Sequence, residues 1–343
     1  MKNINSISKR VMITLFVLLL SVAGMKNTFA QGQVAILQHN DTLSAFYGPD
    51  ALSLAHEAAS DGDTITLSSG NFEGCTLSKA VTIHGAGCVE DTASHRPPTR
   101  IVTYLYLSKT DGTMPLTFEG IWFNSTIYYG VSSGPLCRNV RFIKCNIDAI
   151  SKWTHYTYNF YFENCIIKNF SFNGEGLLVQ NSVVRFTHYN QSNQYNMNFI
   201  FNSVVCFNNS VAMNNTRGFN SILATADGNT ASNSTFYNCI DIQTGNSNLF
   251  EGQLNQTNMQ VSGYEDVFET FAGTVDYQEE YQLKSEIATT FLGNDGTEVG
   301  IHGGMLPYNS RPPYMIIRNT EVAGRTTEDD KLNVQIHLIS NGN

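Results

Sequence analysis

Five basic side chains in the middle of the chain have the chemistry that a metal-independent β-elimination needs. That reaction requires a base to take a proton from carbon and a cation to neutralise the neighbouring carboxylate. The residues that could serve are Lys144, Lys152, Arg185, His155 and His188. A lone His or Lys in a turn is more often a solvated surface residue, so these five are weak lyase candidates.

Two short runs, at 152–158 and 188–195, interleave aromatic with polar residues. Sugar rings stack on exposed aromatic side chains, and both runs occur where outer turns are expected. The candidates for glycan contact are Trp153, Tyr156, Tyr158, Tyr189 and Tyr195. The alternative is that alternation over 153–162 buries one set of rings in the core and exposes the other.

The carboxylates of this region do not share a spacing. A calcium-assisted reaction needs several acidic side chains on one face. Here they fall at different offsets from the repeat described below, and no Cys-x-x-Cys pair or Cys/His cluster has zinc-site spacing. We therefore predict no metal and no cofactor, and calcium enters only under the lyase alternative. The carboxylates concerned are Asp111, Glu119, Asp148, Glu163, Glu175, Asp227 and Asp241.

A repeated dipeptide indicates which elements position these side chains. It consists of Asn or Lys followed by Ser or Cys, and it recurs at intervals of 20, 20, 17, 21, 18 and 18 residues. Such self-similarity is typical of a solenoid. The copies are Asn124-Ser125, Lys144-Cys145, Asn164-Cys165, Asn181-Ser182, Asn202-Ser203, Asn220-Ser221 and Asn238-Cys239.

Each repeat is too short for a strand, a helix and their connections, so the unit must be all-β, with parallel strands stacked turn on turn. The residue two before the pair is bulky and apolar in six of seven copies and is expected to point inward. The residue two after it is mostly β-branched, as in strands. Asn suits left-handed turns, and its amide is expected to bond its equivalent one rung away.

The first thirty residues have the pattern of a secretory signal: basic residues, the apolar run 11–22 and a small-residue cleavage site at Ala30. Its removal takes four of the chain's 20 basic residues, which leaves 16 against 29 acidic ones and a formal charge of −13. Such a surface repels nucleic acid, and no later segment is long and apolar enough to span a membrane. We expect an exported protein of the periplasm, cell surface or extracellular space.

All seven cysteines follow the signal, and an odd number cannot pair completely within one chain. Export permits disulfides. However, Cys145, Cys165 and Cys239 occupy the slot that Ser fills in the other four copies. This equivalence favours small buried side chains over bridges.

Flanking elements are expected to cover the open ends of the solenoid. Before the repeats, 49–59 has the apolar spacing of a helix, and strand candidates follow at 64–67, 75–77 and 81–83. After the repeats we predict a last rung at 281–283, a Gly-rich closure to Gly304, a proline-bearing link over 307–313 and strands at 315–318 and 332–338.

Two segments carry a specific resemblance. Residues 61–65 (DGDTI) followed by 81–87 (VTIHGAG) resemble the opening rungs of secreted right-handed parallel β-helix proteins of the pectate-lyase-like superfamily. Residues 281–284 (YQLK) with 295–304 (DGTEVGIHGG) resemble the terminal rung of the same proteins, in particular uncharacterised exported members from Bacteroidetes. The resemblance covers about residues 45 to 306.

The resemblance implies a three-sheeted right-handed β-helix and an interaction with polysaccharides, especially acidic ones. The chain lacks the Gly-His-Gly segment and the set of Asp residues that polygalacturonases of this fold would need. Fold-level analogy alone is a weak basis for function, because one fold serves many activities.

These features predict an all-β chain in three parts. They are a signal peptide at 1–30, a right-handed parallel β-helix with an N-terminal capping helix and closing rung at 31–306, and a linker with a C-terminal strand pair at 307–343. The leading function hypothesis is a carbohydrate-interacting protein, glycan-binding or adhesin-like, with no recognisable catalytic site. The alternative is a polysaccharide lyase acting on a uronic-acid polymer, and the third hypothesis is a structural surface protein.

Overall fold

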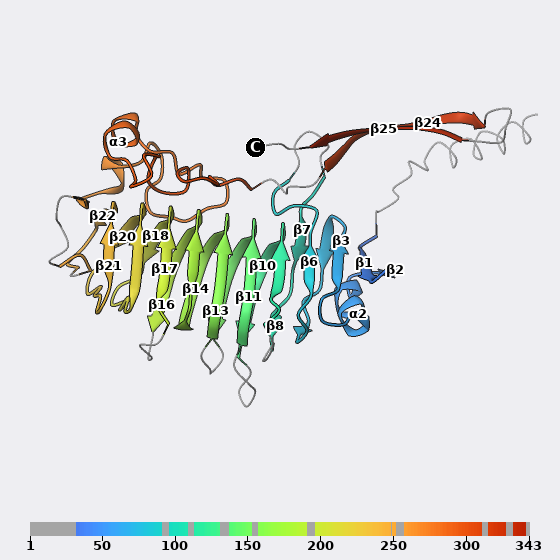
Figure 1. Ribbon diagram of the computed structural model, residues 1–343, viewed down its shortest axis with the longest axis horizontal. Coiled ribbons are helices and arrows are strands. Elements are labelled where there is room, and N and C mark those ends of the chain that lie inside the picture. The colour runs from blue at the N-terminus through green and yellow to red at the C-terminus, as the bar shows by residue number, and fades with distance from the viewer. Residues whose placement is uncertain are drawn as a thin grey trace, which may run out of the picture. The chain divides into compact units, whose positions relative to one another are not determined.

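The computed structural model is a right-handed parallel β-helix, as the repeat predicts (Figure 1). It describes residues 32–90, 96–108, 113–130, 137–152, 157–190, 196–247, 249–251, 257–310, 315–326 and 332–340, the last two ranges by their backbone only. The expected signal peptide therefore lies outside the described residues. Among those described, no helix is long and apolar enough to cross a membrane.

Sheet A is built from one strand per turn, and each strand pairs in parallel with its equivalent in the next turn. Its strands are β3 (Thr64–Leu67), β6 (Thr82–His84), β9 (Leu116–Glu119), β11 (Cys137–Ile143), β13 (Thr157–Glu163), β15 (Leu178–Gln180), β17 (Asn198–Phe201), β19 (Thr216–Phe219) and β21 (Thr235–Tyr237).

Sheet B begins with two short strands per turn, which merge into one longer strand from β10 onward, because β10 pairs with both β7 and β8. Its strands are β4 (Gly70–Phe72), β5 (Thr76–Leu77), β7 (Thr99–Ile101), β8 (Leu105–Leu107), β10 (Trp122–Tyr129), β12 (Asn146–Lys152), β14 (Ile166–Glu175), β16 (Val183–Asn190), β18 (Val204–Phe207), β20 (Ile222–Thr225), β22 (Ile240–Gln243) and β23 (Met259–Val261).

The two sheets enclose one core. The position two before the repeated pair points inward, as predicted, and its rings stack from turn to turn: Phe118, Phe142 and Phe162 lie 5.0 and 5.1 Å apart. The first copy of the repeat is a misalignment by four residues. Glu119 pairs with Ile143, so Gly120, not Asn124, is the equivalent of Lys144.

The first residue of the pair turns the chain from sheet A into sheet B with left-handed backbone, as predicted. In Lys144 and the five Asn equivalents that follow it, φ lies between 44° and 53°. The expected ladder of amides is wrong for this column, because its side chains face another segment. Amide ladders occur in other columns, where Asn159 donates to Asn139 and Asn233 to Asn215.

The segment that faces the Asn column is residues 264–310, here called the closing segment. It contains the 3-10 helix η1 (Tyr264–Asp266) and α3 (Ser285–Thr290) and runs back along the outside of the turns (Figure 1). Asn220 Nδ2 donates to Asn294, Asn181 Nδ2 donates to the Gly303 carbonyl, and Asn164 Oδ1 accepts from the Asn309 N–H. The Asn column therefore holds the closing segment along the turns by hydrogen bonds.

The predicted last rung at 281–283 is also wrong, because these residues belong to the closing segment. Leu283 forms an isolated antiparallel bridge with Phe268 inside the closing segment and joins no sheet. The apolar residues of the closing segment, with Tyr281, pack on the outward side of sheet B and form a second core. The sheet B residues beneath it are Ile166, Val183, Val204, Cys206, Ile222, Ala224, Ile240 and Ile242.

At the N-terminal side, β1 (Val34–His39) pairs antiparallel with β2 (Thr42–Tyr47) and with β3, and α2 (Ala51–Ala58) packs against all three. At the C-terminal side, β24 (Met315–Thr326) and β25 (Leu332–Ser340) form the predicted antiparallel pair. All seven cysteines are free thiols and six are buried, which confirms that the Cys of the repeat fills space.

The second residue of the pair forms a buried hydrogen-bonded ladder. The N–H of Ser182 donates to Ser203 Oγ, the N–H of Ser203 donates to Ser221 Oγ, and each hydroxyl donates to the carbonyl two residues before it. The hydroxyl thus satisfies two backbone groups that no water can reach, since all three serines are fully buried.

We predict that Ser203→Ala lowers the free energy of unfolding by about 1–3 kcal/mol, because it leaves the buried N–H of Ser182 without a partner. Ser203→Cys should cost less, because Cys occupies the same slot in three other turns. Urea unfolding followed by circular dichroism measures both. An Ala variant as stable as the wild type would contradict the role of the ladder.

Candidate functional site

The outward face of sheet A carries a row of aromatic rings, here called the aromatic strip: the exposed Phe199 and Tyr237 and the half-buried Phe201 and Phe219. Phe201 pairs in register with Phe219, and Phe219 with Tyr237. Their centroids lie 5.1 and 5.4 Å apart, with the rings within 15° of parallel. Phe199 adds a ring 5.8 Å from Phe201, and the end members Phe199 and Tyr237 are 37% and 44% exposed.

Strand alternation puts these rings outside. Ile200 and Phe236 point into the core, so the residues on either side of each point away from it. Gly218 has the inward place in the strand between them. A Cβ there would lie 2.5 Å from a Phe236 ring carbon, so glycine makes room for that ring while Arg217 and Phe219 stay outside.

Arginines lie within the aromatic strip and on its N-terminal side. The guanidinium of Arg141 lies 4.8 Å from the ring centroid of Tyr161, that of Arg138 lies 4.8 Å from Tyr158, and Arg217 donates to Thr235 Oγ1 at 2.6 Å. Arg141, Tyr161, Leu178, Phe199, Arg217 and Thr235 form one outward column of the ladder. The face thus combines flat apolar rings with fixed positive charge.

Two carboxylates lie on the same face, Glu119, which pairs with His84, and Glu163. The Tyr161 hydroxyl donates to Glu163, which occupies the neighbouring outward column with Phe201, Phe219 and Tyr237. Burial, and then this hydrogen bond to the carboxylate, raise the pKa of Tyr161 well above its usual value. Tyr161 therefore stays neutral and keeps its ring available to Arg141.

Of the five predicted glycan-contact residues, the structure places Tyr158 on the outward face of sheet A. Tyr189 is wrong as a contact residue. It is 3% exposed, its ring lies in the core, and its hydroxyl is shared with Thr216 and Asn198. Strand β16 alternates there, and Tyr189 falls on its inward side. Trp153, Tyr156 and Tyr195 lie outside the described residues.

The basic candidates do not form one cluster. Lys144 is in the left-handed turn, and Arg185 lies under the closing segment, where it donates to the Gly273 carbonyl at 2.6 Å. Lys152 and His188 do meet, with Nζ and Nε2 3.1 Å apart. Burial, and then the Lys152 charge, lower the pKa of His188, so it is neutral at pH 7. His155 lies outside the described residues.

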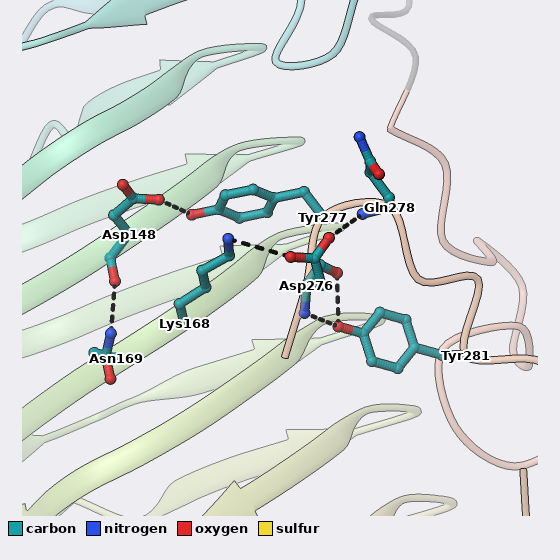
Figure 2. A network of polar contacts seen from close by, with 7 residues as sticks. All are labelled: Asp148, Lys168, Asn169, Asp276, Tyr277, Gln278 and Tyr281. Carbon is teal, nitrogen blue, oxygen red and sulfur yellow. Dashed lines mark hydrogen bonds and ion pairs between the residues drawn. The ribbon is translucent and has the colours of Figure 1, made fainter. Parts of the chain in front are cut away.

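The closing segment is fastened to sheet B by a polar network (Figure 2). Tyr277 Oη donates to Asp148 Oδ1 at 2.5 Å, and the ring of Tyr277 lies under the Lys168 ammonium, 4.0 Å from the centroid. Lys168 also pairs with Asp276 at 3.5 Å. Asp148, Lys168 and Arg185 are outward residues of three successive turns, and the closing segment occupies all three.

A hollow of about 560 Å³ lies at this part of the closing segment, lined mainly by Gln and Glu side chains, including Glu279, Glu280 and Glu298. Burial raises the pKa of Glu298, and the nearby His302 opposes that shift. Within the described ranges, no three His, Cys, Asp or Glu side chains are grouped as a metal site requires. The hollow is polar and lacks the stacked rings of sheet A.

The predicted glycan-contact residues include no member of the aromatic strip, although the sequence carries a signal for it. Phe201, Phe219 and Tyr237 each stand immediately before the repeated pair. The inward residue two before the pair implies that its neighbours point outward, so aromatic residues at this position in three successive repeats indicate an exposed ring ladder.

Comparison of the chain with protein-family models, with curated proteins and with solved structures finds no match.

We predict that Tyr277→Phe loosens the closing segment, because it removes the hydrogen bond to Asp148 and leaves that carboxylate without its hydroxyl partner. The expected loss is about 1.5–3 kcal/mol, as for hydrogen bonds to charged groups. Limited proteolysis should cut the variant first within 264–310. Tyr104→Phe, at an exposed tyrosine elsewhere, is the matched control, and equal cleavage rates in both would contradict the prediction.

Proposed function

We propose that the protein is a noncatalytic binding protein for acidic polysaccharides and that the aromatic strip with its arginines is the contact surface. The observation that carries this proposal is the in-register stack of Phe201, Phe219 and Tyr237 on an outward face. Sugar rings present flat faces of C–H groups, and aromatic rings bind such faces by apolar contact. Exposed apolar patches on soluble proteins commonly mark binding sites.

The regularity of the strip favours a polymer over a small ligand. Rings repeat at the spacing of neighbouring strands, about 4.8 Å. A solenoid offers an extended surface on which equivalent contacts recur turn after turn. A chain molecule with its own regular repeat can use several of these contacts at once, which raises its affinity without any single deep pocket.

The arginines favour an anionic polymer. The chain has 29 acidic and 20 basic residues, yet Arg138, Arg141 and Arg217 are gathered on this one face. Guanidinium groups bind carboxylates in bidentate fashion and stack on flat groups. A uronic-acid polymer offers both a carboxylate and a sugar face at each unit.

We predict that Phe219→Ala weakens binding to polygalacturonate or alginate by roughly tenfold or more, because burial of one such ring is worth about 1.5–3 kcal/mol. Retardation of the protein in gels containing the polymer measures the affinity. Tyr47→Ala, at a 70% exposed tyrosine outside sheet A's outward columns, is the matched control. Equal retardation of both variants would contradict the proposed surface.

Arg217→Gln separates the anionic from the neutral part of the interaction. It should reduce retardation by the acidic polymers and leave any retardation by neutral hydroxyethyl cellulose unchanged. An equal loss on both polymers would mean that Arg217 acts through the fold of the face and not through its charge.

A second candidate function, polysaccharide lyase, has one observation in its favour: the contact between Lys152 and His188. A neutral imidazole can accept the proton from the sugar carbon, and an ammonium beside it can neutralise the uronate carboxylate. His188 is exposed on the outward side of sheet B, and Lys152 is half-buried at the end of β12, where a polymer could reach them.

For the lyase candidate we predict that incubation with a polyuronate raises the ultraviolet absorbance, because elimination leaves an unsaturated sugar. Since the pKa of His188 lies below 6.5, its neutral form persists into mildly acidic solution, and the rate should fall only below the pH at which an ordinary His charges. His188→Gln should abolish the signal, with Tyr47→Ala as control. A flat trace for the wild type would reject elimination on that polymer.

A further inference from the structure

We propose a second glycan-contact surface on the other sheet, which rests on the proposed function and makes the protein a cross-linker of acidic polysaccharide chains. The surface is the outward side of β8 and the second half of β10, together with the residue before β8. Its residues are Tyr104, Tyr106 and Tyr128, here called the tyrosine face.

The tyrosine face is ordered by the same ladder as the aromatic strip. Tyr106 pairs in register with Tyr128, and their rings stack with centroids 5.5 Å apart and 20° between planes. Tyr104, 54% exposed, packs edge-on against Tyr128 at 5.4 Å. Three rings are thus gathered at the surface, two of them at the spacing of neighbouring turns.

The polar groups that follow the tyrosine face suit the same class of ligand. Tyr128 pairs with Ser151 of the next strand, β12. Further along sheet B, Ser171 of β14 pairs with His188 of β16. Lys152, next to Ser151, reaches His188. Hydroxyl groups and a cation beside stacked rings are complementary to the hydroxyls, carboxylates and ring faces of a uronic-acid polymer. We therefore commit to an acidic polysaccharide as the occupant.

The two surfaces lie on different sheets around the same core. Leu105, Leu107 and Ile127 alternate with the tyrosines and point into the core, and Ile200 and Phe236 of sheet A point into the same core. Residues that alternate with inward residues point away from the core, so the two surfaces lie on different sides of the molecule. A polymer segment stretched along one surface therefore leaves the other surface open to a different segment, which is the geometry of a bivalent binder.

Static light scattering of the protein titrated into calcium-free polygalacturonate tests this inference. Cross-linking should raise the scattering to a maximum at an intermediate protein-to-polymer ratio, and excess protein should lower it again as each polymer chain becomes saturated. The double variant Tyr104→Ala/Tyr128→Ala should scatter no more than the polymer with bound monomers, while its gel retardation through the aromatic strip persists.

Controls separate the possible causes. Phe219→Ala should also lose the scattering maximum, Tyr47→Ala should keep it, and Tyr128→Phe should keep it because a ring remains. Retained gel retardation shows that the double variant is folded, and sedimentation shows whether dimers contribute. Retardation of the wild type without a scattering maximum, or a maximum that survives in the double variant, overturns the tyrosine face. Absence of any retardation overturns the proposed function with it.

Discussion

The structure depends on one backbone constraint, the left-handed residue that follows each strand of sheet A from β9 onward. With φ near 50° at Lys144 and its Asn equivalents, the chain turns through the same angle in every repeat and enters sheet B in the same register. Asn tolerates this conformation better than other side-chain-bearing residues. Because the side-chain period of a strand is two, a fixed register also fixes which residues form columns inside and outside.

The outward columns of the two sheets differ in whether another segment covers them. On sheet B, a column of Ile and Val from Ile166 to Ile240 is covered by the closing segment, and the Asn side chains of the turns supply hydrogen bonds that hold that segment along the solenoid. On sheet A, the column from Phe201 to Tyr237 has no such cover among the described residues and stays partly exposed. The same ladder geometry thus builds a second core on one sheet and a ring-lined surface on the other.

Much of the fold follows from sequence because it repeats. Seven dipeptides predict the turn length, the inward Phe positions and the Ser or Cys slot, and the errors occur where the repeat changes its residues. Gly120 and Ile121 stand where later turns have Asn or Lys and Ser or Cys. The sequence pattern therefore places the first copy four residues too late, at Asn124-Ser125. The path of the closing segment could not be predicted, because it is held by contacts such as Asn164 to Asn309, 145 residues apart, that follow no period. Tyr189 was misplaced because aromatic content alone does not tell the inward side of a strand from the outward side.

The aromatic strip is a better candidate binding surface than the charged network under the closing segment, even though the network has the greater variety of chemical groups. Asp148, Lys168 and Arg185 contact Tyr277, Asp276 and Gly273, respectively. These side chains therefore already hold the closing segment against sheet B. Rings that remain at the surface stabilise the fold little, and a flat apolar surface promotes aggregation. Arg217 among the rings and Arg141 further along the same face reduce that hazard by placing like charges where two copies would meet. Under the proposed function, the same charges favour a flat anionic polymer, which can neutralise them and cover the rings at once.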